Sequence, residues 1–140
     1  MLTYTHKVHY YETDKMGIVH HSNYIKWMEE ARMVYLNKIG LSFKKLEDMG
    51  YVSPVIGVNV EYVNPTTFDD EIIVETSLSK YNGVALDVSY IMKNKVSEVV
   101  VAKAKSKHCF IKDKVIVPLQ RDNPQMDAIL KSVLEESITR

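Results

Sequence analysis

Apolar side chains recur at steps of three and four between residues 22 and 39, which predicts one long helix with a single apolar face. That face consists of Tyr24, Trp27, Met28, Ala31, Val34 and Tyr35. Ser22 or Asn23 is expected to cap the helix, since a side-chain oxygen there can accept an unpaired amide, and Gly40 is a stop signal. Because the face is long and rich in large residues, we expect the helix to lie against a sheet.

After residue 50 the period of the pattern changes to two, as is typical of strands. We predict strands over residues 51–63, 72–79, 84–92 and 98–111, and another before the long helix over residues 2–10. The pair Asn82-Gly83 is a strong hairpin signal, so the strands on either side should pair antiparallel. In the last strand small residues alternate with Lys103, Lys105 and Lys107, which predicts one face pressed against a helix and one basic face.

A short helix is predicted after Ser42, its cap, and before Gly50, which lies past its end, and another helix is predicted over residues 123–137. A strand, a long helix and then four strands with short connections predict an α+β fold, with the helix across an antiparallel sheet. We expect residues 1–140 to form one domain, a size that can bury a core. Open edges of such a sheet favour pairing with a second copy, so a homodimer or a homotetramer is expected.

The composition narrows the expected partners and location. Eighteen basic residues balance eighteen acidic ones, which disfavours binding to nucleic acid. The one cysteine, Cys109, cannot form an internal disulfide, and we give it a structural role because no histidine partner is placed for it. We see no secretory leader and no apolar run long enough to span a membrane, so we expect a cytoplasmic protein.

The densest chemistry lies in residues 10–32, directly before and within the long helix. Asp14, Gly17 and His21 precede the predicted helix start in that order. A helix N-terminus presents free amides and a partial positive charge, which can stabilise an anion or a carbonyl oxygen that gains charge. A nearby carboxylate can deprotonate water or attack a carbonyl directly. We therefore place the candidate active site at this helix start.

The pattern Y-x3-D-x2-G-[IV]-V-x-H-x2-Y, followed by a helix with E-x-A-R, resembles the hotdog-fold acyl-CoA thioesterases of the 4-hydroxybenzoyl-CoA thioesterase and YbgC type. In this chain the pattern is carried by Tyr10, Asp14, Gly17, Ile18, Val19, His21 and Tyr24. The resemblance implies a long helix wrapped by a curved antiparallel sheet of about five strands, dimers that share active sites, and tetramers built from them. It also implies hydrolysis of acyl-CoA to a carboxylate and free coenzyme A, with no cofactor beyond the coenzyme A of the substrate.

By position, Asp14 matches the catalytic carboxylate of that family, as general base or as nucleophile. His21 and Tyr10 match supporting catalytic residues of the YbgC branch, and the hydroxybenzoyl branch lacks that histidine. The residues expected to contact substrate around the helix start are Gly17, Val19, Ser22, Asn23 and Tyr24. Lys103 and Lys105 are candidates for the phosphates of coenzyme A.

Simpler interpretations stay open for several of these residues. Asp14 could only cap its local turn, His21 could be an ordinary loop residue, and Tyr10 could be a core aromatic. The lysine row could be a solvated strand face. His6 and His9 should point to opposite faces of the first strand, so we expect no metal site.

Two other functions remain as alternatives to the hydrolase. A hotdog hydratase or dehydratase would need a histidine and an acid arranged to move protons on carbon, which the D-x6-H pattern fits poorly. A binding protein for acyl thioesters would bind acyl-CoA without releasing the thiol.

Overall fold

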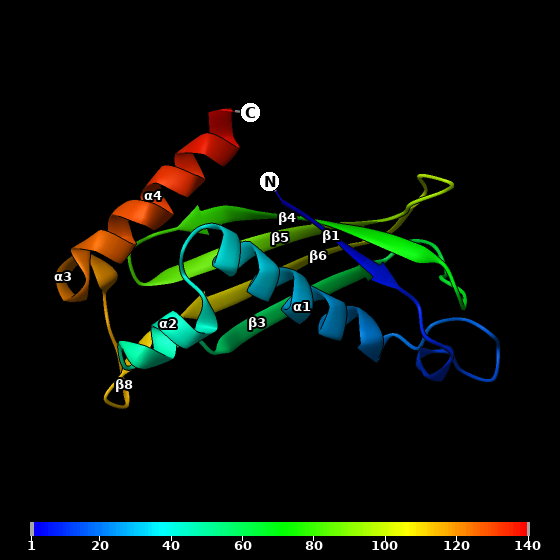
Figure 1. Ribbon diagram of the computed structural model, residues 1–140, viewed down its shortest axis with the longest axis horizontal. Coiled ribbons are helices and arrows are strands. Elements are labelled where there is room, and N and C mark those ends of the chain that lie inside the picture. The colour runs from blue at the N-terminus through cyan, green and yellow to red at the C-terminus, as the bar shows by residue number, and fades with distance from the viewer. Residues whose placement is uncertain (1, 140) are drawn as a thin grey trace.

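The computed structural model describes residues 2–139, in which five strands form an antiparallel sheet in the order β1-β4-β5-β6-β3. Helix α1 (Ser22–Lys38) lies across one face of this sheet (Figure 1). The strands of the sheet are β1 (Leu2–Lys7), β3 (Val55–Tyr62), β4 (Glu71–Tyr81), β5 (Ala85–Asn94) and β6 (Val100–Cys109). The predicted α+β architecture, a long helix on a five-stranded antiparallel sheet, is confirmed.

The remaining elements surround one end of this sheet. Strands β2 (Tyr51–Val52), β7 (Ile111–Lys112) and β8 (Val115–Ile116) form a second, small sheet. Helix α2 (Phe43–Asp48) follows α1, and the short α3 (Leu119–Asp122) leads into α4 (Pro124–Thr139), which packs on β4. None of the helices within residues 2–139 has both the length and the apolar character needed to cross a membrane.

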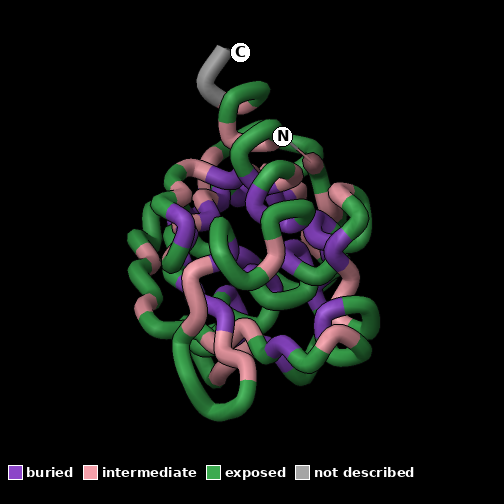
Figure 2. The backbone as a smooth tube through the Cα atoms, turned by 90° about the vertical axis from the view of Figure 1, so that its left-hand side faces the viewer, coloured by how far each residue is buried: buried purple, intermediate pink, exposed green. Residues whose placement is uncertain are grey.

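The core lies between α1 and the inner face of the sheet, and buried segments gather in the interior in Figure 2. Inner positions of β6 are Ala102, Ala104, Ser106 and His108, all buried, while the three lysines between them are exposed. The small side chains let the sheet approach the large residues of α1, as the alternation predicts. Of the predicted helix face only Val34 is substantially exposed, at 38%.

Three predicted strands are shorter than their pattern suggested, among them the last, which ends as β6 at Cys109 while Ile111 belongs to β7. The first ends at Lys7, because residues Tyr10–Glu12 form a 3₁₀ turn, η1. The strand predicted over residues 51–63 divides into β2 and β3, which belong to different sheets. Pro54 lies at the division, and proline has no N–H to continue a ladder.

The predicted cap of the long helix is wrong. The residue at the N-cap position is His21, whose side chain makes no capping bond, and the Ser22 amide donates to Nδ1 of His20 at 3.3 Å. The Ser22 hydroxyl is 2.8 Å from Nδ1 of His20 instead. The Asn23 amide nitrogen donates to the carbonyls of Glu12 and His20, so its side chain serves the segment before the helix. The first turn of α1 therefore begins without the side-chain acceptor that the sequence suggested.

Candidate active site

A small hairpin of residues 12–20 presents Asp14 beside the start of α1. Its two arms are joined by a bridge between Thr13 and Val19 and by a hydrogen bond from the His20 amide to the Glu12 carbonyl, 2.9 Å. At its tip the Asp14 amide donates to the carbonyl of Ile18 at 2.8 Å. Gly17 adopts φ 81°, a left-handed conformation that side chains other than glycine's disfavour, so it shapes the turn.

One oxygen of the Asp14 carboxylate is held by the hairpin itself. Its Oδ1 accepts the amide of Met16 at 2.8 Å. Within residues 2–139 no hydrogen bond to its Oδ2 is present. The side chain is half-buried. The bond to Oδ1 thus orients the carboxylate, and Oδ2 is left to react. Asp14 can therefore cap its turn and also serve as a catalytic group.

Asp14 and His21 line the same cavity, which has a volume of about 340 Å³. It is bounded by Asp14, Met16, Ile18, Val19, His21, Tyr24, Tyr62, Val63, Asn64 and Pro65. The wall combines the hairpin, the first turn of α1, and the segment that follows β3. Four of the predicted site residues, Asp14, Val19, His21 and Tyr24, therefore meet here.

Hydrogen bonds fix the helix start against the neighbouring segments. The Tyr62 hydroxyl donates to the carbonyl of His21 at 2.9 Å. The hydroxyls of Tyr24 and Thr66 are 2.9 Å apart, and the Val19 amide donates to the carbonyl of Thr66 at 2.8 Å. Burial raises the pKa of both the Tyr24 and the Tyr62 phenol, so both stay protonated at neutral pH. Hydrogen bonds therefore join the segments that form the cavity wall.

The other residues predicted near the helix start lie outside this cavity. Tyr10 is 75% exposed, with its ring against that of Phe68. Gly17 sits in the hairpin turn, and Ser22 faces His20. Asn23 is buried beneath the helix start. The last two thus contribute to the local structure through their hydrogen bonds.

Lys103 and Lys105 project from the face of the sheet opposite to α1. The small inner residues of β6 face the core, and the lysines alternate with them. In the pairing register Lys105 lies between Asn59 and Ser89, while Lys103 lies between Glu61 and Ile91. The cavity lined by Asp14 does not include either lysine.

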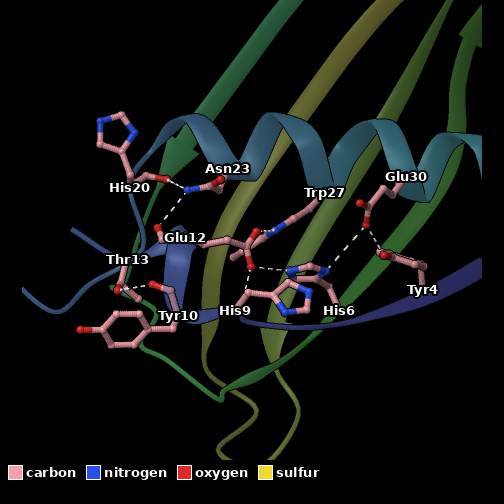
Figure 3. Close-up of polar contacts among 10 residues, drawn as sticks. All are labelled: Tyr4, His6, His9, Tyr10, Glu12, Thr13, His20, Asn23, Trp27 and Glu30. Atoms are coloured by element: carbon pink, nitrogen blue, oxygen red, sulfur yellow. Dashed lines mark hydrogen bonds and ion pairs between the residues drawn. The ribbon is translucent and has the colours of Figure 1, made fainter.

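A buried carboxylate, Glu12, joins the hairpin to α1 and β1 (Figure 3). Its Oε2 accepts the indole N–H of Trp27 at 2.7 Å. Its Oε1 accepts the backbone amide of His9 and lies 2.8 Å from Nε2 of His6. Burial opposes its ionisation, but these hydrogen bonds outweigh that effect and hold the pKa of Glu12 below its ordinary value. No pattern in the sequence singled out Glu12.

His6 and His9 do not diverge as predicted. The strand ends before His9, and the two rings meet edge to face with their centroids 5.4 Å apart. Potential ligand atoms of His6, His9 and Glu12 come within 4.8 Å of one another. Both Glu12 oxygens, however, already accept N–H groups from protein. The cluster is therefore built as a hydrogen-bond network.

The segment after β3 was also missed as part of the site. Asn64-Pro65 signals the end of a strand, but its position beside the helix start depends on the pairing of β3 with β6. Asn64 donates its side-chain amide to the carbonyl of Val100 at 2.8 Å, which secures the segment to β6. Such long-range contacts leave no local signal in the sequence.

Comparison with known proteins identifies the family. The model of the thioesterase-like superfamily matches residues 8–130. The chain is 37% identical over 119 residues to a putative esterase of Aquifex aeolicus, covering 85% of this chain and 91% of that protein. It is 34% identical over 114 residues to the putative acyl-CoA thioesterase YneP of Bacillus subtilis, covering 81% and 82%.

Solved structures agree with this result. The DHNA-CoA thioesterase from Staphylococcus aureus superposes with a TM-score of 0.90 at 27% identity, covering 98% of this chain and 93% of that one. The resemblance to hotdog thioesterases that the sequence pattern carried is thereby confirmed. The chain belongs to the thioesterase-like superfamily.

Proposed function

We propose that the protein hydrolyses acyl-CoA thioesters, with Asp14 as the reactive carboxylate. The observation that carries this proposal is the meeting of Asp14 and His21 in one cavity at the start of α1. Family membership supports thioester hydrolysis, and the similarity to the putative acyl-CoA thioesterase YneP supports the coenzyme A moiety.

Two routes use the same carboxylate oxygen. As general base, Asp14 takes a proton from water, and the resulting hydroxide adds to the thioester carbonyl carbon. The tetrahedral intermediate then collapses, the C–S bond breaks, and the leaving thiolate of coenzyme A takes up the proton that Asp14 accepted from water, which regenerates the carboxylate. As nucleophile, Asp14 adds to the same carbon, expels the thiolate, and forms an anhydride that water hydrolyses. Both routes require an ionised carboxylate with one free oxygen.

The developing oxyanion can be stabilised by backbone amides of the first turn of α1. The amides of Ser22 and Asn23 already donate to Nδ1 and to the carbonyl of His20, at 3.3 Å and 3.0 Å, so the proposed donors are the amides that follow them in this turn. An oxyanion donor is worth about 3 kcal/mol of transition-state stabilisation. His21, at the N-cap position, is assigned to orient the water or the carboxylate, and Tyr10 remains a candidate for a site completed by a second subunit.

The coenzyme A part of the substrate requires groups that bind phosphate. Lys105 is the best-placed candidate of the lysine row, because Asn59 and Ser89 beside it are uncharged. Lys105 lies on the face opposite to α1 and does not line the Asp14 cavity, so we expect a dimer or a tetramer to bring the two ends of one substrate to both sites. We assign the reaction to the cytoplasm, as expected for an enzyme without internal disulfides.

The activity is tested with a panel of acyl-CoAs, from short aliphatic to aromatic, followed by release of free thiol. We expect turnover of at least one member of the panel by the wild-type protein. Asp14 forms an Asx turn with the Met16 amide, and this turn could be its whole role. The competing function is then an acyl-CoA-binding protein without hydrolytic activity. Saturable binding of acyl-CoA without thiol release across the panel would support that function instead.

A further inference from the structure

We propose that Glu12 is a positioning residue of the active site, which holds the Asp14 hairpin at a fixed distance from the start of α1. This inference rests on the proposed function, because it assigns Glu12 to act through Asp14. Glu12 is 4% exposed, stands two residues before Asp14, and does not line the cavity. Its effect on the reaction must therefore be indirect.

The side chain of Glu12 connects three elements. The bond from Trp27 Nε1 to its Oε2 ties the residue to the second turn of α1. The contact of its Oε1 with His6 ties it to β1, and the His9 amide closes the 3₁₀ turn around it. In Figure 3 the carboxylate reaches from this turn toward Trp27 and His6. Hydrogen bonds to an ionised, buried acceptor are stronger than neutral ones, so this junction should be rigid.

The backbone of Glu12 makes the second half of the connection. Its carbonyl oxygen accepts both the amide of His20 and the side-chain amide of Asn23, each at 2.9 Å. His20 closes the base of the Asp14 hairpin, and Asn23 belongs to the first turn of α1. One residue thus links the base of the hairpin to two turns of the same helix.

The hairpin has a second attachment, which does not involve α1 directly. Val19 donates to the Thr66 carbonyl, and Ile18 bridges to Thr67. These bonds hold the outer arm against the segment that follows β3. His20 also bonds to Ser22 and Asn23 in the first turn of α1, whereas Glu12 reaches the second turn as well, through Trp27. We therefore assign to Glu12 the part of this connection that sets the spacing between Asp14 and the helix amides.

The test compares Glu12→Gln and Trp27→Phe with Tyr35→Phe. Trp27→Phe keeps an aromatic ring but removes the N–H donor. Tyr35→Phe removes a buried hydrogen bond on the same helix, to the Leu78 amide, far from the hairpin. We expect kcat to fall by about tenfold or more in the first two variants, because small displacements of reacting groups are costly, with KM within about twofold. Tyr35→Phe should retain kcat within about twofold.

A second measurement separates positioning from general stability. If Glu12 acts through Asp14, then adding Glu12→Gln to Asp14→Asn should lower the remaining kcat by less than about twofold. Full additivity of the two losses would overturn the proposal, as would equal kcat losses in Tyr35→Phe and Trp27→Phe.

A readout without substrate keeps this test independent of the proposed function. Hydrogen exchange of amides in residues 13–19 should quicken in Trp27→Phe and not in Tyr35→Phe. Unchanged exchange there would overturn the positioning role. This measurement needs only Trp27→Phe and Tyr35→Phe to fold, so it can be made even if Glu12→Gln does not fold. If exchange is faster in Trp27→Phe but Asp14→Asn retains full turnover, the proposed function fails. Glu12 then holds the hairpin against α1 but has no role in catalysis.

Discussion

Asp14 and His21 line one cavity from the two ends of the same structural unit, Asp14 near the tip of the hairpin and His21 directly after its base. The carboxylate has one oxygen fixed by Met16, and the histidine backbone is fixed by Tyr62. The site therefore arises from a short segment that long-range bonds hold in place. The proposed roles of its two titratable groups can be separated by mutation.

Replacing His21 by Ala should lower kcat by roughly tenfold, less than loss of the reactive carboxylate, because His21 is assigned to orient rather than to react. The Tyr62 bond reaches the His21 backbone and should survive. His20→Ala is the comparison, since the His20 ring packs on that of His21 but does not line the cavity. The assignment is wrong if both variants keep wild-type kcat, measured by thiol release.

Lys105→Ala should weaken binding of coenzyme A by about threefold to tenfold and reduce its dependence on ionic strength, because phosphate contacts are screened by salt. Titration calorimetry at two salt concentrations measures both effects. Lys44→Ala in α2 removes an equal charge elsewhere and serves as control. Equal affinities of Lys105→Ala and wild type would exclude Lys105 from the phosphate site.

The protein should not be a monomer at micromolar concentration. Strand β3 is an edge of the sheet, and its exposed apolar residues include Val55, Ile56, Val58 and Tyr62. Such an edge is suited to pairing with a second chain. Sedimentation should show a species of about 32 kDa or more, against 16.1 kDa for one chain.

Val58→Lys places a charge on this edge and should shift the sedimentation toward the monomer. Asn59→Lys, at the neighbouring position on the opposite face of β3, provides a control for the charge itself. A wild-type protein that stays monomeric across the micromolar range would disprove the predicted assembly.

Acid should destabilise the fold through His108. Burial, then the charge of Arg32, lowers the pKa of His108 from 6.5 to about 4. A lowered histidine pKa contributes stability that is present above the unfolded value and lost as the pH falls from about 6.5 toward 4. Between pH 7 and pH 5, wild type should lose about 2 kcal/mol more unfolding free energy than His108→Gln. Urea unfolding at both pH values measures the difference, and parallel losses would contradict it.

The periodicity of apolar residues was enough to predict the sheet, the long helix and the inner faces of the strands. It succeeded because α1 and β6 have one buried and one exposed face, so burial repeats along the sequence. It failed at residues 8–10, which were predicted to continue the first strand but lead into a 3₁₀ turn. The Glu12 carboxylate that the turn buries stabilises it, and a buried acid gives no periodic signal.

The site was predicted in part for a related reason. Asp14, Val19, His21 and Tyr24 are close in sequence, so a local pattern can find them. Tyr62 and Asn64 reach the cavity only through the pairing of β3 with β6, which no local pattern encodes. The Ser22 and Asn23 side chains form hydrogen bonds to the hairpin instead of capping α1. The general preference for these residues at helix caps could not show that they bond elsewhere.

The most direct test of the central claim is turnover by Asp14→Asn. The amide keeps the size of the carboxylate and can still accept the Met16 amide, so folding should survive. It is neither a useful base nor a nucleophile, and kcat should fall at least about a hundredfold, with acyl-CoA affinity changed far less. Single-turnover hydrolysis measured beside substrate affinity gives both quantities. A folded Asp14→Asn protein that hydrolyses acyl-CoA at the wild-type rate would contradict the assignment of Asp14 as the reactive group.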